Sequence, residues 1–218
     1  FALVLFLKEL FAMPRPPESV MLVAEDGYGF PSGHAIAGVA VYGGLALEFG
    51  WLEEPPKAIA AGLLAVTVGL SRVVLGVHYL GDVLVGAALG LGVLALGHLL
   101  WRDRPAVGYA LGAVVAVAAV AVSDADPQTV AVLGSCLAGV WACRTIRPLP
   151  ADRGRAERAF LLAVGVVLAV ALVAVRLALE TNRPAQFVVG VATVGAILGL
   201  PALLDSADAF DVVRRFTG

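Results

Sequence analysis

Residues 83–101 read VLVGAALGLGVLALGHLLW, an apolar segment that contains no acidic residue, lysine or arginine. A helix of about 20 apolar residues crosses the ~30 Å hydrocarbon core of a bilayer. The segment therefore predicts a transmembrane helix, and the same pattern recurs on both sides of it.

Similar charge-free runs occupy residues 27–47, 58–71, 105–123, 127–143, 159–175 and 184–204. Of the 218 residues, 60% are hydrophobic and 15% are charged, whereas a soluble domain is about half apolar and about a quarter charged. The mean hydropathy is +0.93. Because backbone groups facing lipid must be hydrogen-bonded internally, we predict an all-α, polytopic transmembrane helix bundle.

The runs and their flanking residues predict helices at about 1–13, 32–49, 57–75, 79–100, 106–122, 128–145, 158–179 and 186–204. Pro14, Pro16 and Pro17 end the first helix, because proline cannot continue a helix. Ser32 and Gly33 suit the start of the second. The first apolar segment, residues 1–11, would span only ~16 Å, so the sequence as given is expected to lack upstream helices.

The cations predict the orientation of the bundle. Ten of the fifteen basic residues fall in alternate loops that share one face: Lys57, Arg102, Arg104, Arg144, Arg147, Arg153, Arg155, Arg158, Arg214 and Arg215. That face should be cytoplasmic, since cytoplasmic loops carry an excess of Lys and Arg. Loops 123–126 and 180–183 would lie on the opposite face. Arg176 is expected to snorkel to the outer interface, with a lipid-headgroup contact as the alternative.

Charge and cysteine usage exclude some partners. The net charge is −2 and the basic residues form no stripe, so we expect no nucleic-acid partner. Cys136 and Cys143 would lie ~10 Å apart on one helix, beyond disulfide reach. We interpret both as packing residues.

Three cations break the charge bias of the outer face: Lys8, Arg15 and Arg72. Ionisable residues beside membrane spans are costly and usually mark a functional site. Topology brings all three to the outer face, where together they could surround a phosphoryl group and neutralise its charge.

Two histidines accompany these cations. His78 and Asp82 are four residues apart, so on a helix beginning by Tyr79 the carboxylate could accept the imidazole N–H and raise the basicity of the other ring nitrogen. Such a histidine is a candidate nucleophile toward phosphorus. His34 is placed to protonate a departing alkoxide. Ser32 and Gly33, at a helix N-terminus, suit an anion.

These residues form three motifs: Lys8-x6-Arg15-Pro16, Pro31-Ser32-Gly33-His34 and Ser71-Arg72-x5-His78-x3-Asp82. In type, order and spacing they resemble the motifs of the type-2 phosphatidic acid phosphatase superfamily, which also includes vanadium haloperoxidases. The resemblance implies metal-independent catalysis without a cofactor. It assigns the phosphohistidine to His78, its support to Asp82 and the general acid to His34, with phosphate held by Lys8, Arg15, Ser32, Gly33 and Arg72.

The resemblance divides the chain and suggests a substrate class. Residues 1–105 would form the catalytic transmembrane core, and residues 106–218 would be additional helices that the resemblance does not cover. The expected activity is phosphomonoester or pyrophosphate hydrolysis on a membrane lipid, at the extracytoplasmic face of the cell membrane. Candidates are phosphatidic acid, phosphatidylglycerol phosphate and polyprenyl pyrophosphate.

Two other functions compete with this one. A vanadate-dependent haloperoxidase would share the anion pocket but is typically soluble. A non-catalytic lipid-phosphate binder or transporter could dispense with the histidines. Between the first two motifs, Glu18, Glu25 and Asp26 are interpreted as a solvated loop, with a role in gating or headgroup choice as the alternative.

Overall fold

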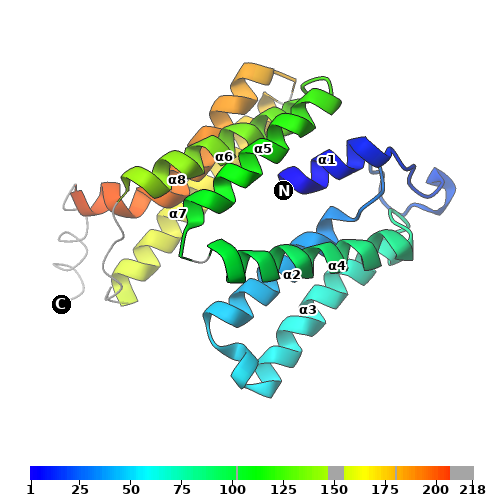
Figure 1. Cartoon of the computed structure of the whole chain (residues 1–218), viewed down its shortest axis with the longest axis horizontal. Helices are drawn as coiled ribbons and strands as arrows, with labels where there is room; N and C mark the ends of the chain where they lie inside the picture. The colour runs from blue at the N-terminus through cyan, green and yellow to red at the C-terminus, as the bar shows by residue number, and fades with distance from the viewer. Residues whose placement is uncertain (102, 147–154, 180, 207–218) are drawn as a thin grey trace. The chain divides into compact units, whose positions relative to one another are not determined.

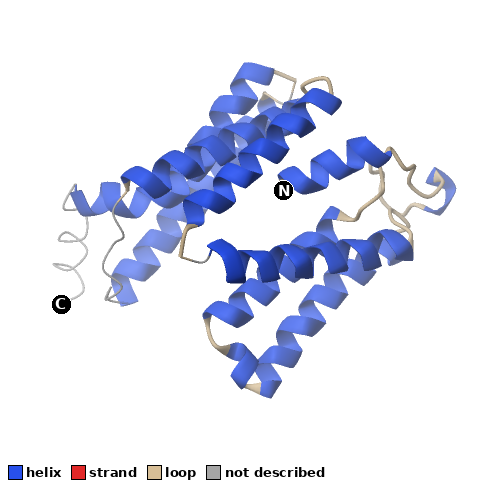
Figure 2. Ribbon diagram, viewed as in Figure 1, coloured by secondary structure: helices blue, strands red, loops and turns tan. Residues whose placement is uncertain are grey.

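The computed structural model describes residues 1–101, 103–146, 155–179 and 181–206, and every regular element in these ranges is helical (Figures 1 and 2). The prediction of an all-α transmembrane bundle is confirmed. Of the orientation-setting cations, Arg102, Arg147, Arg153, Arg214 and Arg215 lie outside the described residues.

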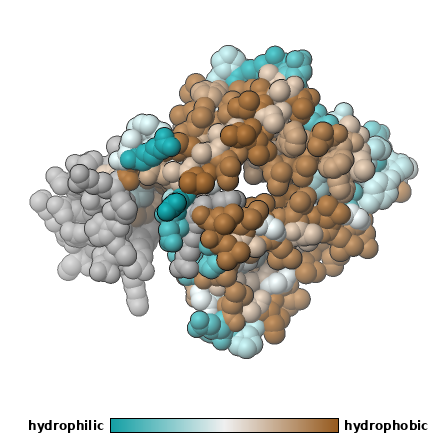
Figure 3. All heavy atoms as spheres, viewed as in Figure 1, coloured by the Kyte–Doolittle hydropathy of each residue, from teal (hydrophilic) through white to brown (hydrophobic). Residues whose placement is uncertain are grey.

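Among the residues that the structure describes, four helical segments are long and apolar enough to cross a membrane: Pro55–Val74, Leu80–Leu100, Pro105–Val122 and Arg183–Ala202. Large apolar side chains on these helices are exposed, among them Leu63 and Val74. Figure 3 shows the resulting broad apolar surface, with hydrophilic residues gathered in separate patches. A surface of this kind is stable in hydrocarbon and unstable in water.

The chain forms two compact units, residues 1–104 and 105–218. The first contains α1 (Ala2–Phe11), η1 (Glu18–Val20), α2 (Gly33–Glu48), η2 (Trp51–Glu53), α3 (Pro55–Val74), α4 (Leu80–Leu96) and the π-helical turn η3 (Gly97–Trp101). Its centre is α2, which packs against both α3 and α4.

Small residues let α2 and α4 approach closely. A Cβ on Gly86 would lie 2.6 Å from the Ser32 carbonyl oxygen, and one on Gly90 would lie 2.9 Å from that of Ile36. Close backbone approach through glycine is the usual way in which membrane helices pack. This packing holds the start of α2 beside the start of α4, and both ends carry candidate site residues.

Helix α2 begins where the sequence predicted. Ser32 is its N-cap, and the Ser32 hydroxyl accepts the Ala35 N–H at 3.4 Å. Helix α1 ends at Phe11, before the prolines, because Ala12 adopts a left-handed conformation and its N–H donates to the Lys8 carbonyl.

The second unit contains α5 (Pro105–Val122), α6 (Pro127–Thr145), α7 (Arg155–Ala178) and α8 (Arg183–Ser206). Helix α6 packs against α5 and most extensively against α8, while α7 packs against α8. Helices α6 and α8 approach closely at Gly134 and Gly190, and the Ser135 hydroxyl donates across this contact to the Gly190 carbonyl at 3.1 Å.

Candidate active site

The three motif segments meet at one end of the first unit through hydrogen bonds to backbone carbonyls. The Ser32 N–H donates to the Asp82 carbonyl at 3.0 Å and joins the second motif to the third. The Arg15 Nη1 donates to the Val77 carbonyl at 3.0 Å and joins the first motif to the third. Side chains separated by more than 60 residues along the chain are thereby brought together.

Arg15 contacts several segments of this cluster. Its Nε donates to the carbonyls of Asp26 and Gly27, both at 3.2 Å, and its Nη1 lies 3.3 Å from the His78 Nε2. The side chain is only 5% exposed. Its third nitrogen, Nη2, donates to Glu25. A guanidinium held at all three nitrogens has little freedom, so its charge is fixed beside the His78 ring.

His78 lies in the turn before α4 and is 2% exposed. Its Nδ1 is 3.4 Å from the Asp82 Oδ2, yet within the described chain that nitrogen makes no hydrogen bond. The Asp82 Oδ2 instead accepts the Tyr79 N–H at 2.8 Å. A small rotation of the ring would bring Nδ1–H onto the carboxylate and leave the lone pair on Nε2, the nitrogen that faces Arg15.

The origin of this pair differs from the expectation. Tyr79 is extended and caps α4, which begins at Leu80, so His78 precedes the helix and Asp82 is its third residue. The helix thus begins one residue later than expected, and the two residues lie close together without sharing a helical face. The capping box of α4 positions the carboxylate, and the turn before it brings the imidazole alongside.

Burial lowers the pKa of His78, and the Arg15 and Lys8 cations lower it further, whereas Asp82 raises it. The net direction is downward because desolvation penalises the imidazolium. Asp82 raises the pKa of the ring, as expected, but this increase is smaller than the decrease caused by burial and the two cations. The lowered pKa favours the neutral imidazole at neutral pH.

Glu25 joins the two arginines of the site. Its Oε1 accepts the Arg15 Nη2 at 2.9 Å, and its Oε2 forms an ion pair with the Arg72 Nη2. Burial alone would raise the pKa of Glu25, but Arg15 and Arg72 together hold that pKa below its ordinary value. The loop is solvated at Glu18 and Asp26, as interpreted, but Glu25 is ion-paired within the site. The contacts of Glu25 could not be found from sequence spacing.

Arg72 retains an unused donor. Among the described residues its buried Nε has no hydrogen-bond acceptor, although Nη2 is paired with Glu25. A buried N–H without a partner is costly and rare in native structures. An acceptor brought by a ligand would satisfy it.

The remaining predicted residues surround this centre. Lys8, half-buried on α1, interacts electrostatically with Arg15, Glu25, Arg72 and Asp82. His34, exposed on the first turn of α2, interacts electrostatically with Arg72, Lys8, Arg15 and Glu25. All the charged site residues predicted from the sequence thus lie within one electrostatic cluster.

Ser32 and Gly33 take part differently. Ser32 is fully buried and its hydroxyl caps α2, so its present contacts hold the helix in place. A Cβ on Gly33 would meet the Val4 side chain at 3.0 Å, which brings α1 against the start of α2. In the described part of the chain, no His, Cys, Asp and Glu cluster could hold a metal ion.

A cavity of about 470 Å³ adjoins the cluster. Its lining comes from the loop between α1 and α2 and consists of Arg15, Pro16, Pro17, Glu18, Met21, Ala24, Glu25, Asp26 and Gly27. Leu22 N–H donates to the Leu75 carbonyl at 2.9 Å and fastens this loop to the turn that precedes His78. The loop therefore forms one wall of the candidate site.

Comparison with known proteins agrees with the motifs. The chain is 43% identical over 91 residues to phosphatidylglycerophosphatase B of Bacillus subtilis, which covers 39% of this chain and 44% of that protein. It is 36% identical over 86 residues to lipid A 1-phosphatase of Porphyromonas gingivalis, covering 38% and 19%. It is also 36% identical over 98 residues to decaprenylphosphoryl-5-phosphoribose phosphatase of Mycobacterium tuberculosis, covering 44% and 51%.

The chain thus spans about half or less of the length of these relatives. No solved structure matches it significantly. The PAP2 superfamily matches residues 1–125, more than half of the chain and all three motifs. The resemblance seen in the motifs is confirmed, and the chain belongs to the PAP2 superfamily.

Proposed function

We propose that this protein is an integral-membrane phosphatase that hydrolyses lipid phosphomonoesters or pyrophosphates through a phosphohistidine, without a metal. One observation carries the proposal: the Arg15 guanidinium that binds Glu25 also lies 3.3 Å from the His78 Nε2. An anion bound to Arg15 in place of Glu25 would lie against the nucleophilic nitrogen.

Substrate binding begins with an exchange of anions. Glu25 occupies Arg15 and Arg72 in the free protein, and the phosphoryl group of the substrate displaces it. The Arg72 Nε, which has no acceptor among the described residues, then gains one. Lys8 adds a third positive charge. The roughly −2 charge of a phosphomonoester balances these three cations better than the single negative charge of the Glu25 carboxylate does.

In the first chemical step the His78 Nε2 lone pair attacks phosphorus as the bond from phosphorus to the lipid oxygen breaks. His34 gives its proton to the departing oxygen, which leaves as an alcohol or phosphate. Asp82 accepts Nδ1–H and stabilises the positive ring. The guanidinium groups of Arg15 and Arg72 stabilise the charge on the equatorial oxygens.

In the second step water cleaves the phosphohistidine. His34, now neutral, takes a proton from water, whose oxygen attacks phosphorus as the bond to Nε2 breaks. His78 returns to the neutral form and inorganic phosphate leaves. Glu25 can then pair again with the two arginines.

A lipid substrate is supported by the setting of the site. The candidate residues adjoin helices α3 and α4, both long and apolar enough to span a bilayer. A lipid tail can remain in hydrocarbon while its phosphate enters the cationic cluster. The relatives named above are phosphatases of lipid-linked phosphates, and the cation distribution supports an extracytoplasmic site.

The test measures phosphate release in EDTA from phosphatidic acid, phosphatidylglycerol phosphate and polyprenyl pyrophosphate. We expect activity with the wild type and a loss of at least about a thousandfold in His78→Ala. Wild-type protein quenched in base during turnover of a ³²P-labelled substrate should carry acid-labile, base-stable label that is absent from His78→Ala. Activity that requires a divalent cation, or that survives in His78→Ala, would exclude this mechanism.

A further inference from the structure

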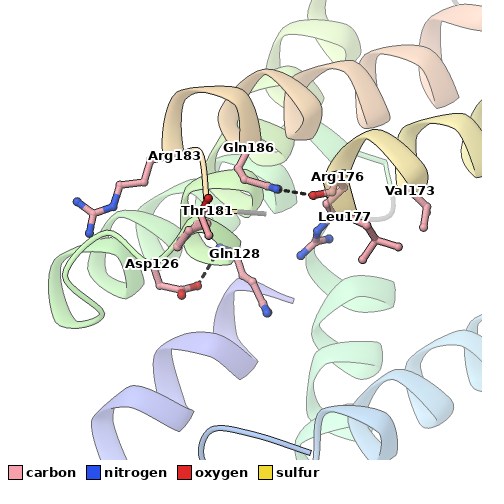
Figure 4. Close-up of a pocket in the computed structure, with 9 residues that line it drawn as sticks. Asp126, Gln128, Val173, Arg176, Leu177, Thr181, Arg183 and Gln186 are labelled. Carbon is pink, nitrogen blue, oxygen red and sulfur yellow. Dashed lines mark hydrogen bonds between the residues drawn. The ribbon is translucent and has the colours of Figure 1, made fainter. Parts of the chain in front are cut away.

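A second cavity, of about 740 Å³, lies entirely within the second unit and contains none of the residues discussed above as catalytic. It lies where α6 and α8 begin and α7 ends (Figure 4). Its walls are formed by Asp126, Pro127, Gln128, Val173, Arg176, Leu177, Thr181, Arg183 and Gln186. Nothing in the family motifs or in the proposed phosphatase reaction uses this cavity.

Its charge favours an anion. Arg176 and Arg183 both line it, and among the described residues neither is in an ion pair. Arg183 donates to the Asp124 carbonyl at 2.9 Å, whereas no hydrogen bond to the described residues involves the half-buried Arg176 guanidinium. The Asp126 carboxylate accepts the Gln128 N–H at 2.8 Å. Arg176 is therefore the cation most available to a ligand.

Gln186 adds a second requirement. It is 2% exposed, and its Nε2 donates to the carbonyls of Arg176 at 2.8 Å and Leu179 at 3.1 Å. These two acceptors fix the orientation of the amide, because only nitrogen can donate to them. The Oε1 is consequently left buried and without a donor in the described part of the chain. A matching ligand must carry a hydroxyl or N–H as well as an anion.

The rest of the lining suits an amphipathic molecule. Pro127, Val173 and Leu177 supply apolar walls, and Val173 and Leu177 are themselves exposed. The loops that carry Asp126 and Arg183 belong to the face predicted to be extracytoplasmic. A phospholipid from that leaflet could place its headgroup in the cavity and keep its chains against α7.

We propose that this cavity binds an anionic phospholipid whose headgroup bears a free hydroxyl, such as a phosphoglycerol headgroup. Its phosphate pairs with Arg176, and its hydroxyl donates to the Gln186 Oε1. The proposal does not depend on phosphatase activity, because the ligand is bound at the second unit and is not turned over.

The test is lipid binding to the full chain in detergent, measured by native mass spectrometry. The probes are phosphatidylglycerol, phosphatidylmethanol, which has the same charge but no hydroxyl, and soluble glycerophosphoglycerol. The variants are Arg176→Gln and, as a matched control at the exposed other end of α6, Arg144→Gln. All proteins carry His78→Ala, so that no lipid is consumed.

We expect phosphatidylglycerol to bind about tenfold more weakly to Arg176→Gln, as the loss of a charged hydrogen bond implies, and normally to Arg144→Gln. Phosphatidylmethanol should bind several-fold more weakly than phosphatidylglycerol to the unsubstituted site. Equal binding of these two lipids, or equal binding by the two arginine variants, would overturn the proposal. If soluble glycerophosphoglycerol bound as tightly as phosphatidylglycerol, the acyl chains would add nothing to binding. That result would overturn the assignment of a lipid ligand.

If Arg176→Gln does not elute as a single folded species, the proposal is still tested by comparing phosphatidylglycerol with phosphatidylmethanol on the protein that keeps Arg176. That comparison removes the headgroup hydroxyls and their carbons, keeps the phosphate charge and leaves the protein unchanged.

Discussion

His78 is held between two opposed influences. Burial, Arg15 and Lys8 lower its pKa, while Asp82 raises it. A nucleophilic imidazole must be neutral. A bound dianion favours the protonated ring, and the neighbouring cations oppose that protonation. The lowered pKa is therefore consistent with the proposed first step.

The pH profile should reflect this balance. As pH falls through the pKa of His78 the ring gains a proton and loses its lone pair, so kcat/KM should fall on the acid side. Because that pKa is below its ordinary value of 6.5, the acid limb should lie below pH 6.5. An acid limb above pH 7 would contradict the argument.

Asp82→Asn gives a second measurement of the same balance. It removes the group that raises the pKa of His78, so the acid limb should move to still lower pH while the maximal rate falls. A limb that moves upward would show that the carboxylate does not support the protonated ring.

Glu25 should compete with phosphate. Glu25→Gln removes the carboxylate that pairs with Arg15 and Arg72, so inorganic phosphate should inhibit about three- to tenfold more tightly, the range expected for a partly exposed ion pair. The matched control is Glu18→Gln, an exposed residue of the same loop. Inhibition constants from competitive kinetics measure the effect. Unchanged or weaker inhibition in Glu25→Gln would exclude an exchange of anions.

The sequence did not reveal the contacts of Glu25. Arg15 and Arg72 were found because they belong to motifs with fixed spacing, whereas Glu25 reaches Arg72 across 47 residues. No local periodicity records such a pair. Its partner could be assigned only once the loop was seen to fold back on the turn before His78.

The turn that joins α3 to α4 depends on Gly76. This residue has a φ of +71°, and a Cβ there would collide with the Val20 carbonyl oxygen. That close approach accompanies the hydrogen bond from the Leu22 N–H to the Leu75 carbonyl and fixes the α1–α2 loop against the turn that precedes His78. Only glycine fits both the conformation and the space.

Gly76→Ala should therefore be far more disruptive than Gly27→Ala. Gly27 has a similar φ of +76°, but a Cβ at that position would meet no atom within 4 Å, so its substitution should cost about 1–2 kcal/mol. Gly76→Ala adds a backbone collision and should cost about 2–4 kcal/mol. Thermal unfolding in detergent measures both, and equal melting temperatures would show that the loop does not pack on this turn.

The membrane orientation can be tested on the intact protein. In a Cys136→Ser, Cys143→Ser background, Glu18→Cys and Glu53→Cys place single thiols at exposed positions on either side of α2. A membrane-impermeant maleimide applied to whole cells should label Glu18→Cys and label Glu53→Cys only after lysis. The reverse pattern would place the candidate site in the cytoplasm.

The sequence by itself determined the helical class, the approximate ends of the helices and the membership of the PAP2 superfamily. It could do so because a bilayer leaves the backbone no alternative to internal hydrogen bonding and because charged residues are rare in apolar segments. The assignment of catalysis to residues 1–105, and the roles given to the motif residues, stay predictions.

Tertiary structure alone decided what the motifs touch. It set His78 before α4 instead of on it and paired Glu25 with two arginines. It also left the Gln186 Oε1, in a cavity of the second unit that Arg176 lines, without a partner among the described residues. These features arise from contacts between distant segments, whose geometry depends on how helices and loops pack and is not encoded in local residue spacing.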